Sequence, residues 1–140
     1  MADVRLLRQV ERAAQLLSRH LASRLGDHLT DAEAHVLFHL NHLPRGIQPS
    51  MKELRAAFGL RPSTLTAIVD RLERQGLVAR RTHPEDRRSL LVVPTASATA
   101  AIGRVSRLLD GIEATVASRV TPADLQGCTA VLRALEDALR

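Results

Sequence analysis

Residues 63–97 decide the fold, and they read STLTAIVDRLERQGLVARRTHPEDRRSLLVVPTAS. The first apolar residues recur every three to four positions, which predicts a helix that ends at Gly76. Two short runs of branched apolar residues follow at 77–81 and 89–93, and a polar, arginine-rich loop joins them, which predicts a β-hairpin. A helix followed by a basic hairpin is typical of a winged helix-turn-helix, in which the helix enters one groove of DNA and the cations lie beside it.

The residues before this stretch supply the remaining helices. Thr30 with Glu33 and Ser50 with Glu53 have the spacing of capping boxes, so a helix is predicted to start at each. Gly59 ends the second of these helices, and Pro62 starts the next after a tight turn. Amphipathic helices are also predicted over residues 3–24, from about 96, and from 121 to the C-terminus.

Composition restricts the class of protein. A chain of 140 residues with 45% apolar and 25% charged residues is expected to form one folded domain. Its net charge is +5, and 19 of the 20 basic residues are arginine because Lys52 is the only lysine. Arginine suits phosphates and guanine edges. A GC-rich genome explains the arginine bias equally well, but it does not explain why arginines gather in the hairpin.

Several classes of protein are not supported by the sequence. The chain has no apolar run long enough to cross a membrane and no signal-peptide core, so a cytoplasmic protein without a membrane partner is expected. Its single cysteine, Cys128, excludes an intrachain disulfide and is expected to be a buried, inert thiol. Residues 35–39 read HVLFH and lack the glutamate of a zinc-protease motif, and no nucleotide-binding or nucleophile motif is present. We therefore expect neither an enzyme nor a cofactor.

The first turn of the helix that starts at Pro62 carries small polar side chains, and these would let the helix lie deep in a major groove. Either Ser63 or Thr64 is also expected to cap this helix. The hairpin tip carries Arg80 and His83 beside further arginines, which suit a narrow minor groove, although a solvated charge run is the alternative. Asp86 is expected to pair with a nearby arginine and so fix the loop. The predicted DNA-binding residues are Ser63, Thr64, Thr66, Ala67, Arg71, Arg81, Arg87 and Arg88.

Histidines recur along one side of the helix that starts at Thr30. His35 and His39 are four residues apart and, with His42, are candidate ligands for zinc or a similar metal ion. The same groups titrate near neutral pH, so a pH-sensitive interface is a second interpretation. A polar flank beside the apolar face is the third, and no cysteine or acidic cluster accompanies the set.

The chain resembles MarR-family transcriptional regulators along nearly its whole length, most clearly in residues 65–80 and 86–89. The resemblance implies a mainly α fold with a small β-hairpin wing. It implies a single domain over 1–140, with a winged helix-turn-helix core at about 29–95 and dimerisation helices at about 3–24 and 96–140. It also implies that Asp86 orients the wing and that Arg88 enters a minor groove. One departure is Ala98, which occupies a position where the family commonly has glycine.

The sequence therefore predicts a homodimeric regulator, most often a repressor in this family, that binds double-stranded DNA at a pseudo-palindrome. Half-sites are expected about 10 bp apart. The resemblance also implies a small anionic or phenolic effector; with only Phe38 and Phe58 as aromatic residues, its pocket would be aliphatic with arginine and histidine. Two alternatives remain: a metal- or pH-responsive regulator using the histidines, and a winged-helix protein-interaction module without DNA binding. The arginines of the wing disfavour the second.

Overall fold

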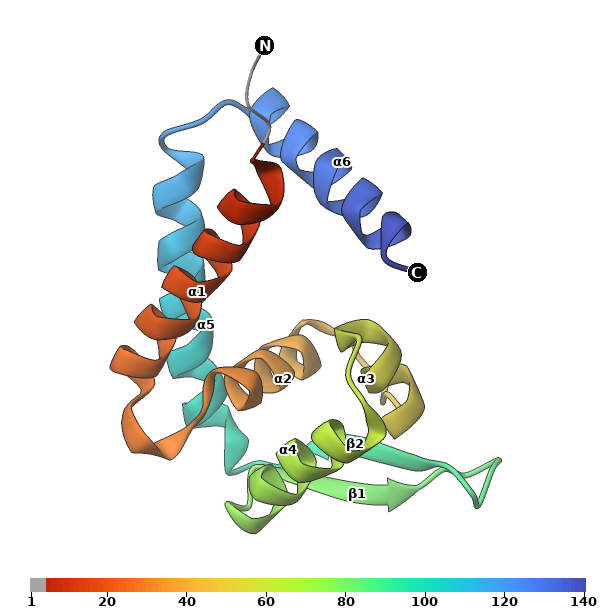
Figure 1. Cartoon of the computed structure of the whole chain (residues 1–140). Coiled ribbons are helices and arrows are strands. Elements are labelled where there is room, and N and C mark those ends of the chain that lie inside the picture. Colours follow the sequence, from red (N-terminus) through yellow and green to blue (C-terminus); the bar gives the residue numbers. More distant parts are fainter. Residues whose placement is uncertain (1–4) are drawn as a thin grey trace. The chain divides into compact units, whose positions relative to one another are not determined.

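The computed structural model describes residues 5–140 and confirms a mainly α fold with one two-stranded hairpin (Figure 1). The predicted start of the first helix at residues 3–4 lies outside the described residues. The elements are α1 (Leu6–Leu25), a 3-10 turn (Gly26–His28), α2 (Asp31–His42), α3 (Met51–Phe58), α4 (Pro62–Arg74), β1 (Val78–Thr82), β2 (Leu90–Pro94), α5 (Ala98–Ala117) and α6 (Pro122–Ala138). None of the helices within the described residues is long and apolar enough to cross a membrane.

Capping boxes start three of the helices, as local sequence chemistry requires. The Thr30 hydroxyl accepts a hydrogen bond from the Glu33 amide at 3.2 Å, and Ser50 with Glu53 repeats the arrangement at the start of α3. Both predicted boxes are thereby confirmed. Thr121 and Asp124 form a third box at α6, where hydrogen bonds from the backbone and then the side chain of Thr121 lower the pKa of the Asp124 carboxyl. This pairing favours the folded state above a pH of about 4 and is lost as the pH falls further.

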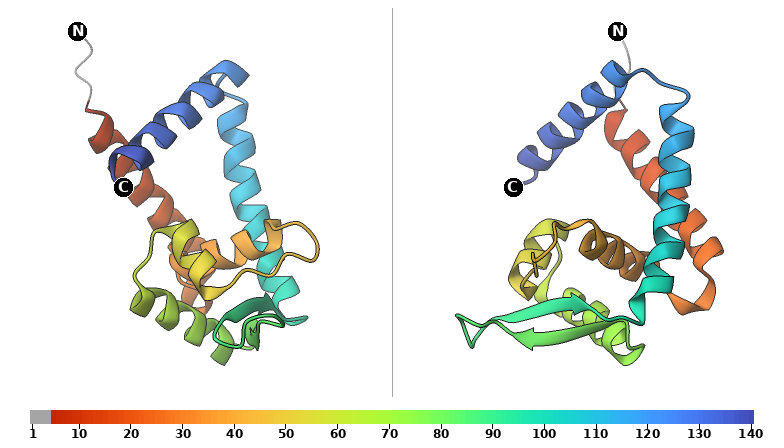
Figure 2. Two further views of the ribbon diagram at one scale, coloured as in Figure 1. Left: turned by 90° about the vertical axis from the view of Figure 1, so that its right-hand side faces the viewer. Right: turned by 180° about the vertical axis from the view of Figure 1, so that it is seen from behind.

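The helix-turn-helix and the hairpin follow the predicted order. Gly59 ends α3 with φ +62°, in the left-handed region that favours glycine, and α4 begins three residues later. The antiparallel strands pair from Val78 opposite Pro94 to Thr82 opposite Leu90. Each strand starts one residue later than predicted, because Leu77 still belongs to the turn after α4 and its amide donates to Leu72. The hairpin extends beyond α3 and α4 in Figures 1 and 2.

The chain divides after Val105 into two compact units. In the first unit, α1 to α4, the hairpin and the start of α5 share one apolar core. The side chains of this core that are fully hidden from solvent include Leu21, Ala34, Leu37, Leu54, Leu65, Val69, Leu72, Val92, Ala98 and Val105. This packing sets α4 against the rest of the unit and leaves its opposite side free.

The second unit, residues 106–140, contains the end of α5 and all of α6. No side chain of α6 is buried, although its apolar residues share one side of the helix. Cys128 is exposed in the described chain, so the prediction of a buried thiol is wrong. The predicted single domain and its subdivision stay predictions, because they depend on what covers this apolar side.

Candidate nucleic-acid interface

The side of α4 that faces away from the core presents small polar groups. Arg61 is the N-cap of α4 and makes no side-chain capping bond, so the prediction that Ser63 or Thr64 caps the helix is wrong. The proline ring of Pro62 already sets the backbone of the first turn, which makes a capping side chain dispensable. Within the described residues, the hydroxyls of this side make no hydrogen bond to protein and are free to meet a ligand. The exposed predicted contacts on α4 are Ser63, Thr64, Thr66, Ala67 and Arg71.

A buried carboxylate positions Arg71. Glu33 of α2 is 1% exposed, and its Oε1 lies 2.9 Å from Nε of Arg71. The other Glu33 oxygen accepts the Thr30 amide at 3.1 Å. Because Oε1 accepts no well-aligned hydrogen bond from a described residue, the contact with Arg71 is chiefly electrostatic. The Arg71 side chain is still 48% exposed, so Glu33 of α2 orients this arginine on the exposed side of α4 without hiding it.

The tip of the hairpin is a short turn whose shape depends on its own backbone. Asp86 Oδ1 accepts the amide of Arg88 at 3.0 Å, and the Asp86 carbonyl accepts the amide of Ser89 at 3.0 Å. The predicted pairing of Asp86 with an arginine side chain is therefore wrong, because the carboxylate reaches an amide two residues on before any guanidinium. His83 also stabilises the turn, because its Nδ1 accepts a hydrogen bond from the Glu85 amide. The hairpin carries three exposed arginines that form no ion pair within the described residues: Arg81, Arg87 and Arg88.

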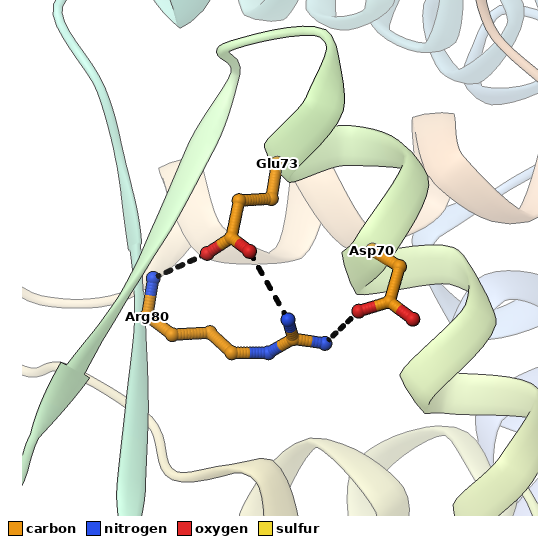
Figure 3. A network of polar contacts seen from close by, with 3 residues as sticks. All are labelled: Asp70, Glu73 and Arg80. Atoms are coloured by element: carbon orange, nitrogen blue, oxygen red, sulfur yellow. Dashed lines mark hydrogen bonds and ion pairs between the residues drawn. The ribbon is translucent and has the colours of Figure 1, made fainter.

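Arg80 reaches from β1 to α4, where it binds Asp70 and Glu73 (Figure 3). Its guanidinium lies 2.5 Å from the Asp70 carboxylate and 3.1 Å from that of Glu73, and its amide also donates to Glu73. The expectation that Arg80 belongs to the cationic tip is wrong, because two carboxylates one helical turn apart on α4 attract it. These contacts neutralise the acidic side of α4 and connect β1 to α4. The feature of the sequence that could have predicted these contacts is the pair of acidic residues at positions 70 and 73, which are three residues apart.

We expect Arg80→Ala to lower the free energy of unfolding by about 1–2 kcal/mol, after allowance for solvent screening of the half-exposed carboxylates. It should also weaken DNA binding, since Asp70 and Glu73 then face phosphates without a countercharge. Thermal unfolding and DNA titration check both effects. In an Asp70→Asn, Glu73→Gln background, Arg80→Ala should lower the free energy of unfolding by a smaller amount. An equal loss of stability in both backgrounds would show that the ion pairs do not stabilise the fold.

The histidines of α2 do not converge. His35 Nε2 lies 3.1 Å from Asp31 Oδ1, His42 Nδ1 lies 2.8 Å from the Phe38 carbonyl oxygen, and His39 packs edge-on against Phe58. Within residues 5–140, no group of three histidine, cysteine or acidic side chains is arranged to bind a metal ion. These three side chains contact Asp31, the Phe38 carbonyl and Phe58 instead of one another, and a metal-responsive function stays a prediction.

Comparison with known proteins identifies the same region. The profile of the MarR family matches residues 29–89, which comprise α2, α3, α4 and most of the hairpin. The chain is 36% identical to YcgE, an uncharacterized HTH-type transcriptional regulator of Bacillus subtilis strain 168, over 92 residues. This match covers 65% of the chain and 56% of YcgE, so it spans little more than half of that relative.

Solved structures share the fold along the whole chain. S. aureus MepR in its DNA-binding conformation has a TM-score of 0.82 at 19% identity, with 100% of each chain covered. BpsR of Bordetella bronchiseptica, whose DNA binding is regulated by 6-hydroxynicotinic acid, has a TM-score of 0.77 at 22% identity over 98% of this chain and 96% of BpsR. At these identities the likeness establishes the winged helix-turn-helix fold, and the residues of the surface must carry the argument about function.

Proposed function

We propose that the chain is a MarR-family transcriptional regulator, a homodimeric repressor that binds a specific DNA operator and is released by a small-molecule effector. The observation that carries this proposal is the placement of a free polar side of α4 next to unpaired arginines of the wing. Members of the family are regulators and not enzymes, so binding equilibria alone account for the function.

Each protomer places α4 in a major groove. The short side chains of Ser63, Thr64 and Ala67 allow close approach, and their hydroxyl and methyl groups suit phosphates, base edges and thymine methyls. Arg71, oriented by Glu33, extends the same surface. The wing carries Arg88 into the adjacent minor groove, where a narrow groove strengthens the negative potential that attracts arginine.

The exposed apolar side of α6 supports the homodimer. Leu125, Val131 and Leu132 are each exposed by about two fifths, and Leu139 by 78%. A hollow of about 540 Å³ beside them is lined by Ile112, Val116 and Leu125 among others. An apolar surface of this kind is unfavourable in water and suits a second copy, and two-fold symmetry would then match two half-sites of a pseudo-palindrome.

A hollow in the first unit supports the effector. It encloses about 460 Å³ and combines aliphatic Leu29, Leu77 and Ala101 with the polar groups of His28 and Arg104. This lining suits a small organic anion, with Arg104 as its cationic partner. Gln75, at the end of α4, also lines the hollow and donates to the His28 carbonyl at 2.9 Å. A ligand there would contact the end of the recognition helix, which gives it a route to bias DNA binding.

Fluorescence anisotropy tests the proposal directly. The purified protein is titrated onto DNA from upstream of its own gene and onto scrambled DNA of equal length, across a salt series. We expect nanomolar, salt-dependent binding that prefers the upstream DNA. Equal binding to both DNAs would contradict a specific regulator of its own promoter, and no binding to either would favour a protein-interaction module.

Arg88→Ala should weaken operator binding by about tenfold or more, since a charge-assisted contact in a minor groove is lost. The measurement is the same titration at moderate salt, beside Arg107→Ala as a control with an equal change in net charge on exposed α5. An Arg88→Ala affinity equal to that of the control would show that the wing does not contact DNA through this residue.

A further inference from the structure

Among the side chains that the structure describes, Glu33 of α2 is the only charged one that is buried. Burial of a carboxylate is unfavourable unless its neighbours compensate for the lost water. The capping box does not explain this burial, because Glu53 makes the same two hydrogen bonds with Ser50 at the start of α3 and is exposed. Glu33 therefore has a task beyond capping α2.

The two oxygens of Glu33 have different partners. Oε2 accepts the Thr30 amide at 3.1 Å, which is the bond that the cap requires. Oε1, which the cap does not use, is hidden from water and lies 2.9 Å from Nε of Arg71. Glu53 forms no ion pair among the described residues. The contact with Arg71 is thus the feature that distinguishes the buried carboxylate from the exposed one.

This contact holds the guanidinium of Arg71 at one end and leaves the other end free. The terminal nitrogens Nη1 and Nη2 make no hydrogen bond or ion pair with a described residue, and the side chain is half-exposed. Thr64 and Ala67 precede Arg71 by seven and four residues, so the three lie in one row on the exposed side of α4. A guanidinium held at Nε presents its terminal nitrogens as a fork, which matches O6 and N7 of guanine in a major groove.

We propose that Glu33 is a positioning residue for operator recognition, which holds Arg71 so that its terminal nitrogens read one guanine in each half-site. The inference rests on the proposed function and adds the base that Arg71 specifies. An arginine held in advance loses less conformational freedom when it meets DNA. It also discriminates between bases more strongly, because it cannot turn towards the acceptors of a wrong base. A contact with a phosphate carries no sequence information and requires no such alignment.

The test measures base discrimination by anisotropy titration of the operator, of operators in which each G·C pair is changed singly, and of scrambled DNA. One such change should weaken wild-type binding by about tenfold or more, and Arg71→Ala identifies this base pair because its discrimination there should vanish. Glu33→Gln keeps an oxygen for the cap but loses the charge that holds Arg71. It should reduce the discrimination at the same base pair to about threefold or less, with little change in binding to scrambled DNA.

Glu53→Gln is the matched control, because it makes the same substitution in the other capping box without an arginine beside it. It should keep the wild-type discrimination at every base pair. Arg71→Lys keeps the charge without the fork, so it should keep the salt dependence of binding and lose the discrimination. In the Arg71→Ala background, Glu33→Gln should cause no further loss of discrimination. This double variant also removes the unpaired buried charge that Arg71→Ala leaves, and thermal unfolding verifies that each variant is folded.

The outcomes separate this inference from the proposed function. If Arg71→Ala weakens binding to operator and scrambled DNA by the same factor, Arg71 contacts a phosphate, and the inference is overturned while the proposed function stands. Wild-type discrimination in folded Glu33→Gln would also overturn it, because Arg71 would then read its base without being held. An equal loss in Glu33→Gln and Glu53→Gln would assign the effect to helix capping and contradict a positioning role. If the wild type does not prefer the operator, the proposed function fails and this inference fails with it.

Discussion

Ala67→Glu is expected to lower operator affinity by about a hundredfold or more, which corresponds to about 3 kcal/mol. Ala67 is exposed on the side of α4 opposite its buried leucines, where a protomer would approach base edges most closely. A glutamate there would place a carboxylate against phosphates and base acceptors, and it would also hold the helix away from the groove. Anisotropy titration of the operator measures the loss.

The same substitution should leave the fold intact, because glutamate is a good helix former and position 67 contributes nothing to the core. Ala100→Glu, exposed on α5, is the matched control for added charge and volume. Ala67→Ser should bind nearly as well as the wild type, since serine is small and polar. Retention of operator affinity by Ala67→Glu would place the recognition surface somewhere other than α4.

Val131→Asp combined with Leu132→Asp is expected to convert the proposed homodimer to monomers at micromolar concentration. Both side chains are exposed apolar residues on α6, and a carboxylate in a desolvated interface without a partner is strongly unfavourable. Operator affinity should then fall by about a hundredfold or more, because each protomer binds one half-site without the linked second contact. Sedimentation and anisotropy together measure the two effects.

Ala130→Asp is the control for this experiment, since position 130 lies on the opposite side of α6 from the leucines at 125 and 132. It should remain dimeric and retain DNA binding. If the Val131→Asp, Leu132→Asp variant sediments like the wild type, α6 is not the dimer interface. If the wild type is itself a monomer at micromolar concentration, the homodimer is wrong.

Local chemistry made most of the secondary structure predictable. The capping residues Thr30 and Ser50 satisfy backbone amides within three residues, so the starts of α2 and α3 depend on almost nothing else. Gly59 and Gly76 supply the positive φ that the turns beside α4 require. The wing was predictable because its pattern is also local: two runs of branched apolar residues mark the strands, and the polar residues between them mark the tip. The exact strand limits were one residue off, because the turn after α4 takes up Leu77.

Partners across the chain were not predictable in the same way. Arg80 and Arg81 are neighbours with the same chemistry, yet β1 directs Arg80 towards Asp70 and Glu73 and leaves Arg81 exposed. Strand alternation separates adjacent side chains to opposite faces, but only packing decides which face meets the helix. Glu33 and Arg71 are likewise 38 positions apart, and they meet because α2 packs beside α4.

The sequence by itself determined the order of the helices, the turn, the wing and the small polar residues of the recognition helix, because each of these depends on interactions within a few residues. The tertiary structure decided which charges remain free. It neutralises Arg80 and orients Arg71 through buried Glu33. Electrostatic pairing depends on distance in space and on exposure to water, and neither can be read from separation along the chain.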